Sequence, residues 1–302
     1  MQLVYEGKDI AQAVEINRAD VTDNAGGVAD SLELWFNDPL GWWSQWQPEK
    51  NHTVEVIRDG YSSGIMFIDE LEQQRGRFVI RALSIPQEAR TKNTRSWENI
   101  RFLILAGEIA AKYGFALETY GITNHLYERV DQQDMADFEF LAFRCMLEGY
   151  LLKLYNKKVV IYDSRYIEGQ APVREMDMSG FDGEYRFRRT STGIYGSCRL
   201  TYGSIWSECK ANAAGPVLKI SSIPVYSQDE ADRFAKGMLR YHNCRENTGA
   251  CTIPFDSGIA AGCNINITGV GLADGKYFCE KIVHRLVDGK TFQSMYKPLE
   301  GY

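Results

Sequence analysis

Few residues of this 302-residue chain have types and spacings that could do chemistry. The segment from Gly271 to Tyr277 is similar to a phosphate-binding loop, in which backbone N–H groups cradle phosphates and a Ser or Thr hydroxyl binds Mg²⁺. It has one residue too few between Gly271 and Gly275, and Tyr277 stands where the hydroxyl should be. The sequence therefore predicts no nucleotide site, and we expect no cofactor.

A pair of carboxylates is the second candidate. Asp134 and Asp137 have the residue type that glycosidases use as acid and nucleophile. Capping of a helix that begins near Asp134 explains the pair more simply, because carboxylates favour helix N-termini. The sequence also contains neither a G-x-S-x-G nor an H-E-x-x-H motif. We therefore expect no catalytic residues and a protein that is not an enzyme.

Metal and redox chemistry are not indicated either. The four histidines share no metal-ligand spacing, and the pair His242 and Cys244 is more typical of a helix end than of a metal site. The seven cysteines contain no C-x-x-C pair. We expect buried free thiols in a reducing cytosol, without an essential disulfide or metal. The cysteines are Cys145, Cys198, Cys209, Cys244, Cys251, Cys263 and Cys279, and the histidines are His52, His125, His242 and His284.

Composition and charge limit the partners. Hydrophobic content of 44% and charged content of 25% are ordinary for a globular protein, and no run of about 18 apolar residues predicts membrane insertion. Met1 to Asp9 is interpreted as a first strand rather than a signal peptide. Residues 1–86 hold seven Lys and Arg against fourteen Asp and Glu, which argues against sequence-specific nucleic-acid binding. These carboxylates either line an acidic channel or face solvent.

Residues 1–86 have the pattern of an antiparallel β structure. Alternating apolar residues in 31–36, 53–57 and 78–83 predict short strands, and Asp59-Gly60 is a tight-turn signal before a strand at 64–69, although the expected loop is longer than two residues. Strands of five or six residues at this spacing are typical of a small barrel or sandwich.

Trp42, Trp43 and Trp46 lie in an expected loop between Pro39 and Pro48. One interpretation is local packing over the end of the barrel. The other is a partner or subunit contact, because Trp is enriched at interface hot spots. As a set, these three residues are our candidate interface.

The middle of the chain changes from strand to helix periodicity. Apolar spacing predicts a helix over 97–113 with Ser96 as N-cap and Gly114 as its stop, and then a strand over 115–118. A second helix is predicted from near Asp134 to Gly149, followed by a hairpin over 151–162.

The last part returns to strands. Residues 164–180 are a linker candidate, and Ser227 begins a capping box for one inserted helix. The fold class is therefore α+β and mainly β. Two β segments around an insert suggest three domains: a β-barrel over 1–86, a helix–strand–helix–hairpin unit over 87–170, and a second β-barrel over 171–302 with one inserted helix.

The order of these elements resembles a known family, the late control gene D proteins of phages, which are baseplate hub proteins of contractile tails. The hub region of type VI secretion spike proteins is related to it. The resemblance covers nearly the whole chain and is moderately specific. It is carried by Arg95-Ser96-Trp97, Tyr113-Gly114-Phe115, Gln132-Gln133, Asp137 with Phe140-Leu141, Gly149, Gly275-Lys276-Tyr277, Val283-His284 and Gly289.

The resemblance implies two tube-like antiparallel β-barrels with an intervening α/β unit. It implies a homotrimer that acts as a symmetry adaptor between a hexameric tail tube and a trimeric spike. The implied partners are the tail tube or tube initiator protein and the spike protein, with tape measure and baseplate wedge proteins as further candidates. Because the sequence ends at Tyr302, soon after the last expected strand, the spike is expected to be a separate polypeptide.

The implied location is the bacterial cytoplasm during synthesis and the baseplate of a phage or phage-like particle, such as a tailocin, after assembly. The rival functions are a cell-wall carbohydrate-binding protein and a peptidoglycan-degrading tail protein. A sugar binder could use Trp42, Trp43 and Trp46 as a stacking platform.

Overall fold

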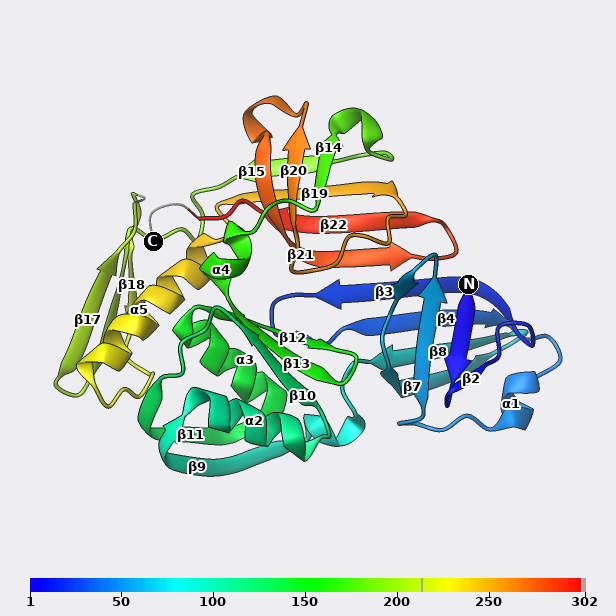
Figure 1. Ribbon diagram of the computed structural model, residues 1–302, viewed down its shortest axis with the longest axis horizontal. Coiled ribbons are helices and arrows are strands. Elements are labelled where there is room, and N and C mark those ends of the chain that lie inside the picture. Colours follow the sequence, from blue (N-terminus) through cyan, green and yellow to red (C-terminus); the bar gives the residue numbers. More distant parts are fainter. Residues whose placement is uncertain (213, 300–302) are drawn as a thin grey trace.

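The computed structural model describes residues 1–212 and 214–299. Strands make up 47% of the chain and helices 20%, which confirms an α+β fold that is mainly β. Figure 1 shows three parts: a β unit formed by the N-terminal residues, a helix-containing unit formed by the middle of the chain, and a β unit formed by the C-terminal residues. Within the described residues, no helix is long and apolar enough to cross a membrane.

The N-terminal β unit follows the predicted alternation. In β4, the side chains of Leu32, Leu34 and Phe36 are buried, whereas the residues between them face outward. Asp59 and Gly60 both have positive φ values and form a two-residue turn, as hairpins prefer. The strands are β1 (Gln2–Tyr5), β2 (Lys8–Asp9), β3 (Glu15–Asn24), β4 (Ser31–Asn37), β5 (Thr53–Arg58), β6 (Tyr61–Ser62), β7 (Met66–Gln74) and β8 (Arg77–Leu83).

The middle unit packs two helices against two small sheets. One sheet pairs β9 with β11, and the other has the order β10-β13-β12. The elements are η1 (Gln87–Arg90), β9 (Lys92–Arg101), α2 (Phe102–Lys112), β10 (Ala116–Tyr120), β11 (Leu126–Ala136), α3 (Asp137–Glu148), β12 (Tyr150–Tyr155), β13 (Lys158–Asp163) and α4 (Ser164–Gly169).

Two helix starts in this unit were predicted too early. Ser96 does not cap a helix but lies inside β9, where it pairs with Asp131 of β11, and α2 begins six residues later. Asp134 lies in an irregularity of β11 with φ 47°, and α3 begins at Asp137. Pairing between two long strands outweighs the local helical spacing of the same residues. The predicted stops at Gly114 and Gly149 are confirmed, with φ values of 69° and 75°.

The C-terminal part contains a β unit and a separate three-stranded sheet covered by α5. Ser227 caps α5 as predicted, because its side chain accepts a hydrogen bond from the backbone N–H of Glu230. Residues 164–180 are not a linker: they form α4, β14 and η2, and β14 pairs with β20. The elements are β14 (Arg174–Asp177), η2 (Met178–Gly180), β15 (Arg186–Arg189), β16 (Ser197–Tyr202), β17 (Ile205–Lys210), β18 (Val217–Ile220), α5 (Gln228–Asn243), β19 (Asn247–Pro254), β20 (Asn264–Thr268), η3 (Gly271–Ala273), β21 (Gly275–Arg285) and β22 (Lys290–Tyr296).

Strand β21 joins the two β units into one sheet. Residues 275–278 pair with β20, whereas residues 281–285 pair with β3 of the N-terminal unit. The main path of pairing is β15-β19-β22-β21-β3-β4-β8-β7-β5-β1-β2, and Figure 1 shows β3 and β21 side by side. Pairing along the described strands gives this open path, so closure into two barrels stays a prediction.

Three apolar cores underlie the three parts. One fills the N-terminal unit, one fills the C-terminal β unit, and the largest contains α2 and α3 together with apolar residues of β16 and α5. The inserted helix α5 therefore packs on the middle unit. We keep the division into 1–86, 87–170 and 171–302 as a proposal about the domains and describe the packing by these cores.

Candidate assembly surfaces

The tryptophan segment is a five-residue helix, α1 (Trp42–Trp46), rather than the expected loop. Gly41 before it and Gln47 after it both have left-handed backbone conformations, which confine the helix to little more than one turn. The Asp38 carboxylate accepts a hydrogen bond from the backbone N–H of Trp42 at 2.7 Å. Three indoles are thereby held at one end of the N-terminal β unit (Figure 1).

The three indoles have different environments. Trp43 is 3% exposed and stacks on Phe78, with ring centroids 5.3 Å apart and an interplanar angle of 7°. Trp42 and Trp46 are 48% and 45% exposed, and the neighbouring Leu40 is 68% exposed. The interpretation as local packing therefore applies to Trp43. Trp42 and Trp46 are free to contact a partner, and their role as an interface stays a prediction.

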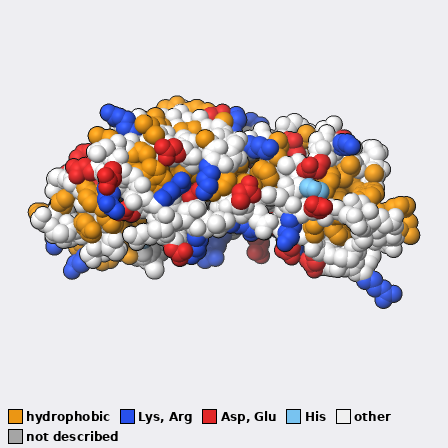
Figure 2. All heavy atoms as spheres, turned by 90° about the horizontal axis from the view of Figure 1, so that it is seen from below, with side chains coloured by type: hydrophobic (Ala, Val, Ile, Leu, Met, Phe, Trp, Pro, Cys, Tyr) orange, Lys and Arg blue, Asp and Glu red, His pale blue; other side chains and the backbone are white. Residues whose placement is uncertain are grey.

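In Figure 2, hydrophobic, acidic and basic side chains are interspersed over the face, and some of the hydrophobic side chains lie at the right-hand end. That is the end at which α1 lies in Figure 1. A pocket of about 230 Å³ opens here, with the three indoles and Asp38 among the residues that line it.

The outer face of the N-terminal sheet carries a network of paired charges. Arg81 of β8 contacts Glu33 of β4 at 3.2 Å and also Glu70 and Glu72 of β7, at 2.7 and 3.2 Å. Arg18 of β3 pairs with Glu33 at 3.4 Å. Because these carboxylates are paired with arginines, the acidity of residues 1–86 is partly neutralised on this face. Four of the fourteen carboxylates of this segment, namely Asp20, Asp23, Asp30 and Asp38, are buried.

Several residues that carry the family resemblance meet at one buried carboxylate. Asp137 is fully buried and accepts hydrogen bonds from Lys112, Tyr113 and Gln132 at 2.7, 2.8 and 2.8 Å. Asn93 and Arg95 donate to it as well, at 3.1 and 3.2 Å. We call Asp137 and these five donors the Asp137 cluster.

The Asp137 cluster favours the ionised form of the carboxylate. Burial alone would raise the pKa of Asp137, but the hydrogen bonds from Lys112, Gln132 and Tyr113 outweigh it and hold the pKa below its ordinary value. Asp134 lies apart from the cluster, exposed and paired with Lys92 at 3.1 Å. Asp137 is the first residue of α3, so the helix N-terminus interpretation holds for Asp137 but not for Asp134, which lies in β11.

Aromatic packing extends the cluster into the core. Trp97 stacks on Phe140, with ring centroids 5.6 Å apart, and Arg95 lies over the Trp97 ring at 4.5 Å. In the C-terminal unit, Tyr277 and His284 from the resemblance are buried as well. The His284 imidazole contacts Thr291 Oγ1 at 2.9 Å and the Ile259 carbonyl at 3.1 Å. These motif residues contribute to packing and hydrogen bonding within the fold.

The junction of the three parts contains a second buried network. Lys153 of β12 pairs with Asp23 of β3 and donates to the carbonyl of Ala261 at 3.0 Å. Asp23 in turn accepts from the backbone N–H of Ala261 at 2.8 Å. Burial raises the pKa of the adjacent Asp30 well above its ordinary value, and the Asp23 charge raises it further. One lysine thus links all three parts of the chain.

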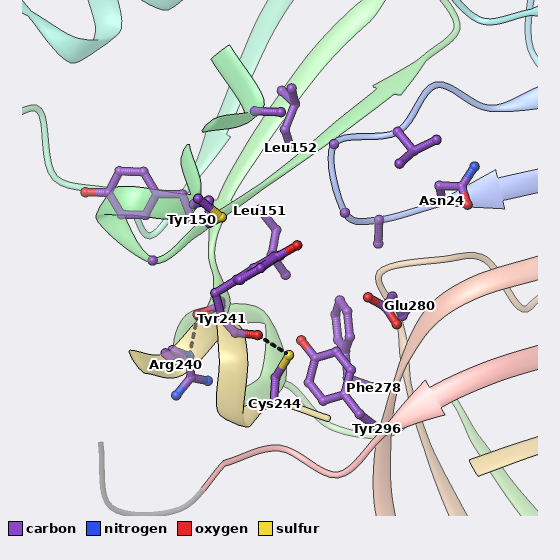
Figure 3. Close-up of a pocket in the computed structure, with 18 of the residues that line it drawn as sticks. Asn24, Tyr150, Leu151, Leu152, Arg240, Tyr241, Cys244, Phe278, Glu280 and Tyr296 are labelled. Carbon is purple, nitrogen blue, oxygen red and sulfur yellow. Dashed lines mark hydrogen bonds between the residues drawn. The ribbon is translucent and has the colours of Figure 1, made fainter. Parts of the chain in front are cut away.

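A cavity of about 310 Å³ lies beside this junction (Figure 3). Its walls come from the β3–β4 loop, β12, the end of α5, and β21 with β22. Cys244 lines this cavity and has a side chain that could act as a nucleophile. Burial raises the pKa of its thiol to about 12, and its Sγ contacts the Tyr241 carbonyl at 3.1 Å. A thiol in this state is a poor nucleophile.

The remaining sequence candidates are not brought together. Gly271 to Tyr277 forms the short η3 turn and the start of β21, and Tyr277 donates its hydroxyl to the carbonyl of Ala273 at 2.7 Å. In the described part of the chain, no group of three or more His, Cys, Asp and Glu residues could hold a metal ion. All seven cysteines are free thiols.

The fold is shared with proteins of known origin. A 43 kDa tail protein of prophage MuSo2 from Shewanella oneidensis superposes with a TM-score of 0.77, 11% identity and 98% coverage of both chains. A tail protein from Neisseria meningitidis MC58 gives 0.75 and 14% identity over 98% of this chain and 95% of that one. This is the fold of phage tail proteins.

The tail-protein fold also extends to a secretion system. The c3393 protein of E. coli, described as a type VI secretion component similar to T4 tail proteins gp27 and gp5, superposes with a TM-score of 0.63. Its identity is 11%, over 100% of this chain and 79% of that one. No family model matches the chain, and no protein of curated function matches it in sequence. The resemblance to baseplate hub proteins is confirmed at the level of the fold.

Proposed function

We propose that this chain is a structural baseplate hub subunit of a contractile tail or related injection machine. The observation that carries the proposal is the likeness of the whole fold to tail proteins, with a TM-score of 0.77 over 98% of both chains. A structural role also fits the Asp137 cluster and the Lys153 network, in which the polar residues stabilise packing between elements. In this role three copies form a ring that connects a hexameric tail tube to a trimeric spike.

The proposed trimer would match the symmetry of both partners. A closed ring of three identical subunits, each with two β units, presents six similar β surfaces to a sixfold tube and three equivalent positions to a threefold spike. The continuous path of paired strands from β15 to β2 supports this geometry, because it joins the two β units of one subunit directly.

Mass measurement tests the proposal. Multi-angle light scattering at micromolar concentration, with and without the products of neighbouring genes, should give three times the subunit mass of 34.3 kDa in at least one condition. A monomer in every condition would contradict the symmetry-adaptor role. A monomer that becomes a trimer only with a spike protein would support it and place the spike in the assembly step.

A carbohydrate-binding tail protein is the second candidate, because Trp42 and Trp46 expose their indoles as sugar-binding platforms do. Specific binding of cell-wall oligosaccharides that is lost on replacing both residues by Ala would favour it over the hub.

A further inference from the structure

The pocket beside α1 combines aromatic walls with negative charge. Its volume of about 230 Å³ is below the usual range for drug-sized ligands and suits a single long side chain. Trp42, Trp43 and Trp46 form part of the wall, and the lining also includes the carboxyl residues Glu15 and Asp38. None of its lining residues, all within the described part of the chain, is Lys, Arg or His.

Asp38 is the unusual member of this lining. It is 3% exposed, and its Oδ1 accepts the backbone N–H of Trp42. Its Oδ2 is buried and has no hydrogen-bond partner among the described residues. A buried carboxylate oxygen without a donor is costly, so a cation or N–H donor brought into the pocket would be stabilised by it.

We propose that this pocket binds an arginine side chain of a partner protein. A guanidinium is planar, weakly hydrated and stacks on indoles, while its N–H groups can donate to carboxylates. The same unit already shows this chemistry: the guanidinium carbons of Arg18 and Arg77 lie 5.3 and 5.0 Å from the ring centroid of Trp35. The α1 pocket likewise places indoles next to carboxylates.

Charge decides between this occupant and a sugar. A sugar ring also stacks on indoles, and its hydroxyls can donate to carboxylates, but it carries no positive charge to pair with them. An arginine satisfies both the aromatic wall and the Asp38 charge. The inference concerns the pocket itself and does not depend on the trimer.

The probe is N-acetyl-L-arginine amide, and the readout is ¹⁹F NMR of the full chain labelled with 5-fluorotryptophan. The six tryptophans give six signals, assigned by single Trp→Phe variants. We expect saturable shifts of the Trp42 and Trp46 signals in the millimolar range. Trp206, which is 59% exposed on β17, is the internal control and should not shift.

Two comparisons make the test specific. N-acetyl-L-citrulline amide has the same shape without the charge and should bind about fivefold more weakly or not at all. Asp38→Asn should weaken the arginine probe about fivefold. Because Asp38→Asn could disturb α1, Glu15→Gln at the exposed rim is the second variant, with an expected loss of about twofold.

Three outcomes would overturn the proposal: no saturable shift at Trp42 or Trp46, equal binding of the arginine and citrulline probes, or binding of tri-N-acetylchitotriose in place of arginine. The last would assign the pocket to sugars. Unequal binding of the two amino-acid probes, with Trp206 unaffected, would support the arginine site even if Asp38→Asn failed to fold.

Discussion

Asp137 and Asp38 are both buried carboxylates, but they differ in how completely they are hydrogen-bonded. Asp137 accepts from five side chains, which come from β9, from the end of α2 with its C-cap Tyr113, and from β11. Asp38 accepts one backbone N–H, and its second oxygen is unpaired among the described residues. The first carboxylate stabilises the interior of the subunit. The second leaves an interaction that a neighbouring molecule can complete.

The largest expected effect is at Asp137. Asp137→Asn replaces one oxygen acceptor by a donor and leaves Lys112 and Arg95 without their anion. Removing one partner of a buried ion pair typically costs about 3–5 kcal/mol, and because Lys112 and Arg95 are partly exposed we expect the low end, a loss of about 3 kcal/mol in the free energy of unfolding. Urea denaturation followed by circular dichroism measures it. A loss below about 1 kcal/mol would show that the donors are satisfied by water instead.

The same variant has a pH signature. Because the pKa of Asp137 is lowered in the folded state, its contribution is present above the ordinary pKa of 3.8 and is lost as the pH falls through the folded value. The wild type should therefore lose more stability than Asp137→Asn on acidification below about pH 4. If the free energy of unfolding fell equally in the two proteins below about pH 4, the lowered pKa of Asp137 would be contradicted.

The tryptophans of α1 provide the next test. Trp43→Ala should cost about 3 kcal/mol, the low end for a buried aromatic residue, because it removes the stacking on Phe78. Trp42→Ala and Trp46→Ala should each cost less than about 1 kcal/mol, since both indoles are half exposed.

Trp42 and Trp46, which matter least for stability, should matter most for assembly with partner proteins. The double Trp42→Ala and Trp46→Ala variant should fold normally and assemble more weakly with its partners, whereas Trp206→Ala, a matched exposed indole elsewhere, should assemble normally. If the double variant assembled as fully as the wild type, Trp42 and Trp46 would not form an interface.

The last expected effect is a pH dependence of stability at Asp30, a third buried carboxylate. Its pKa is raised by burial and by Asp23, so the folded state holds a proton that the unfolded state has released. Stability from this group is complete below pH 3.8 and is lost as the pH rises through the folded pKa. Asp30→Asn should therefore gain on the wild type as the pH rises from 4 to 7, by at most about 1.4 kcal/mol per pH unit. A constant difference between the two proteins over this range would rule out the raised pKa.

Local signals in the sequence predicted much of the fold. Turns at Asp59-Gly60 and the helix stop at Gly149 are set by residues that tolerate positive φ values, and the cap at Ser227 is a short-range bond. These features depend on neighbours in the chain, so a single sequence contains them.

Long-range pairing was the part that the sequence concealed. Residues 97–101 have helical spacing, yet they extend β9 because a strand 30 residues away pairs with them. The cluster around Asp137 was hidden for the same reason: its donors come from residues 93 to 132, and the motif order that carried the resemblance did not show that they meet. Asp38 gave a weaker signal, since an Asp before Pro39 indicates a turn and says nothing of an unpaired oxygen.

Strand β21 has a mechanical consequence. Its eleven residues pair with β20 at one end and with β3 at the other. The two β units are therefore joined by hydrogen bonds between strands as well as by the connecting chain. A bend between them would have to shear the ladder of hydrogen bonds along β3, β21 and β22 all at once. A load applied to one β unit would therefore pass to the other through many bonds in parallel, and the subunit would respond as a stiff plate.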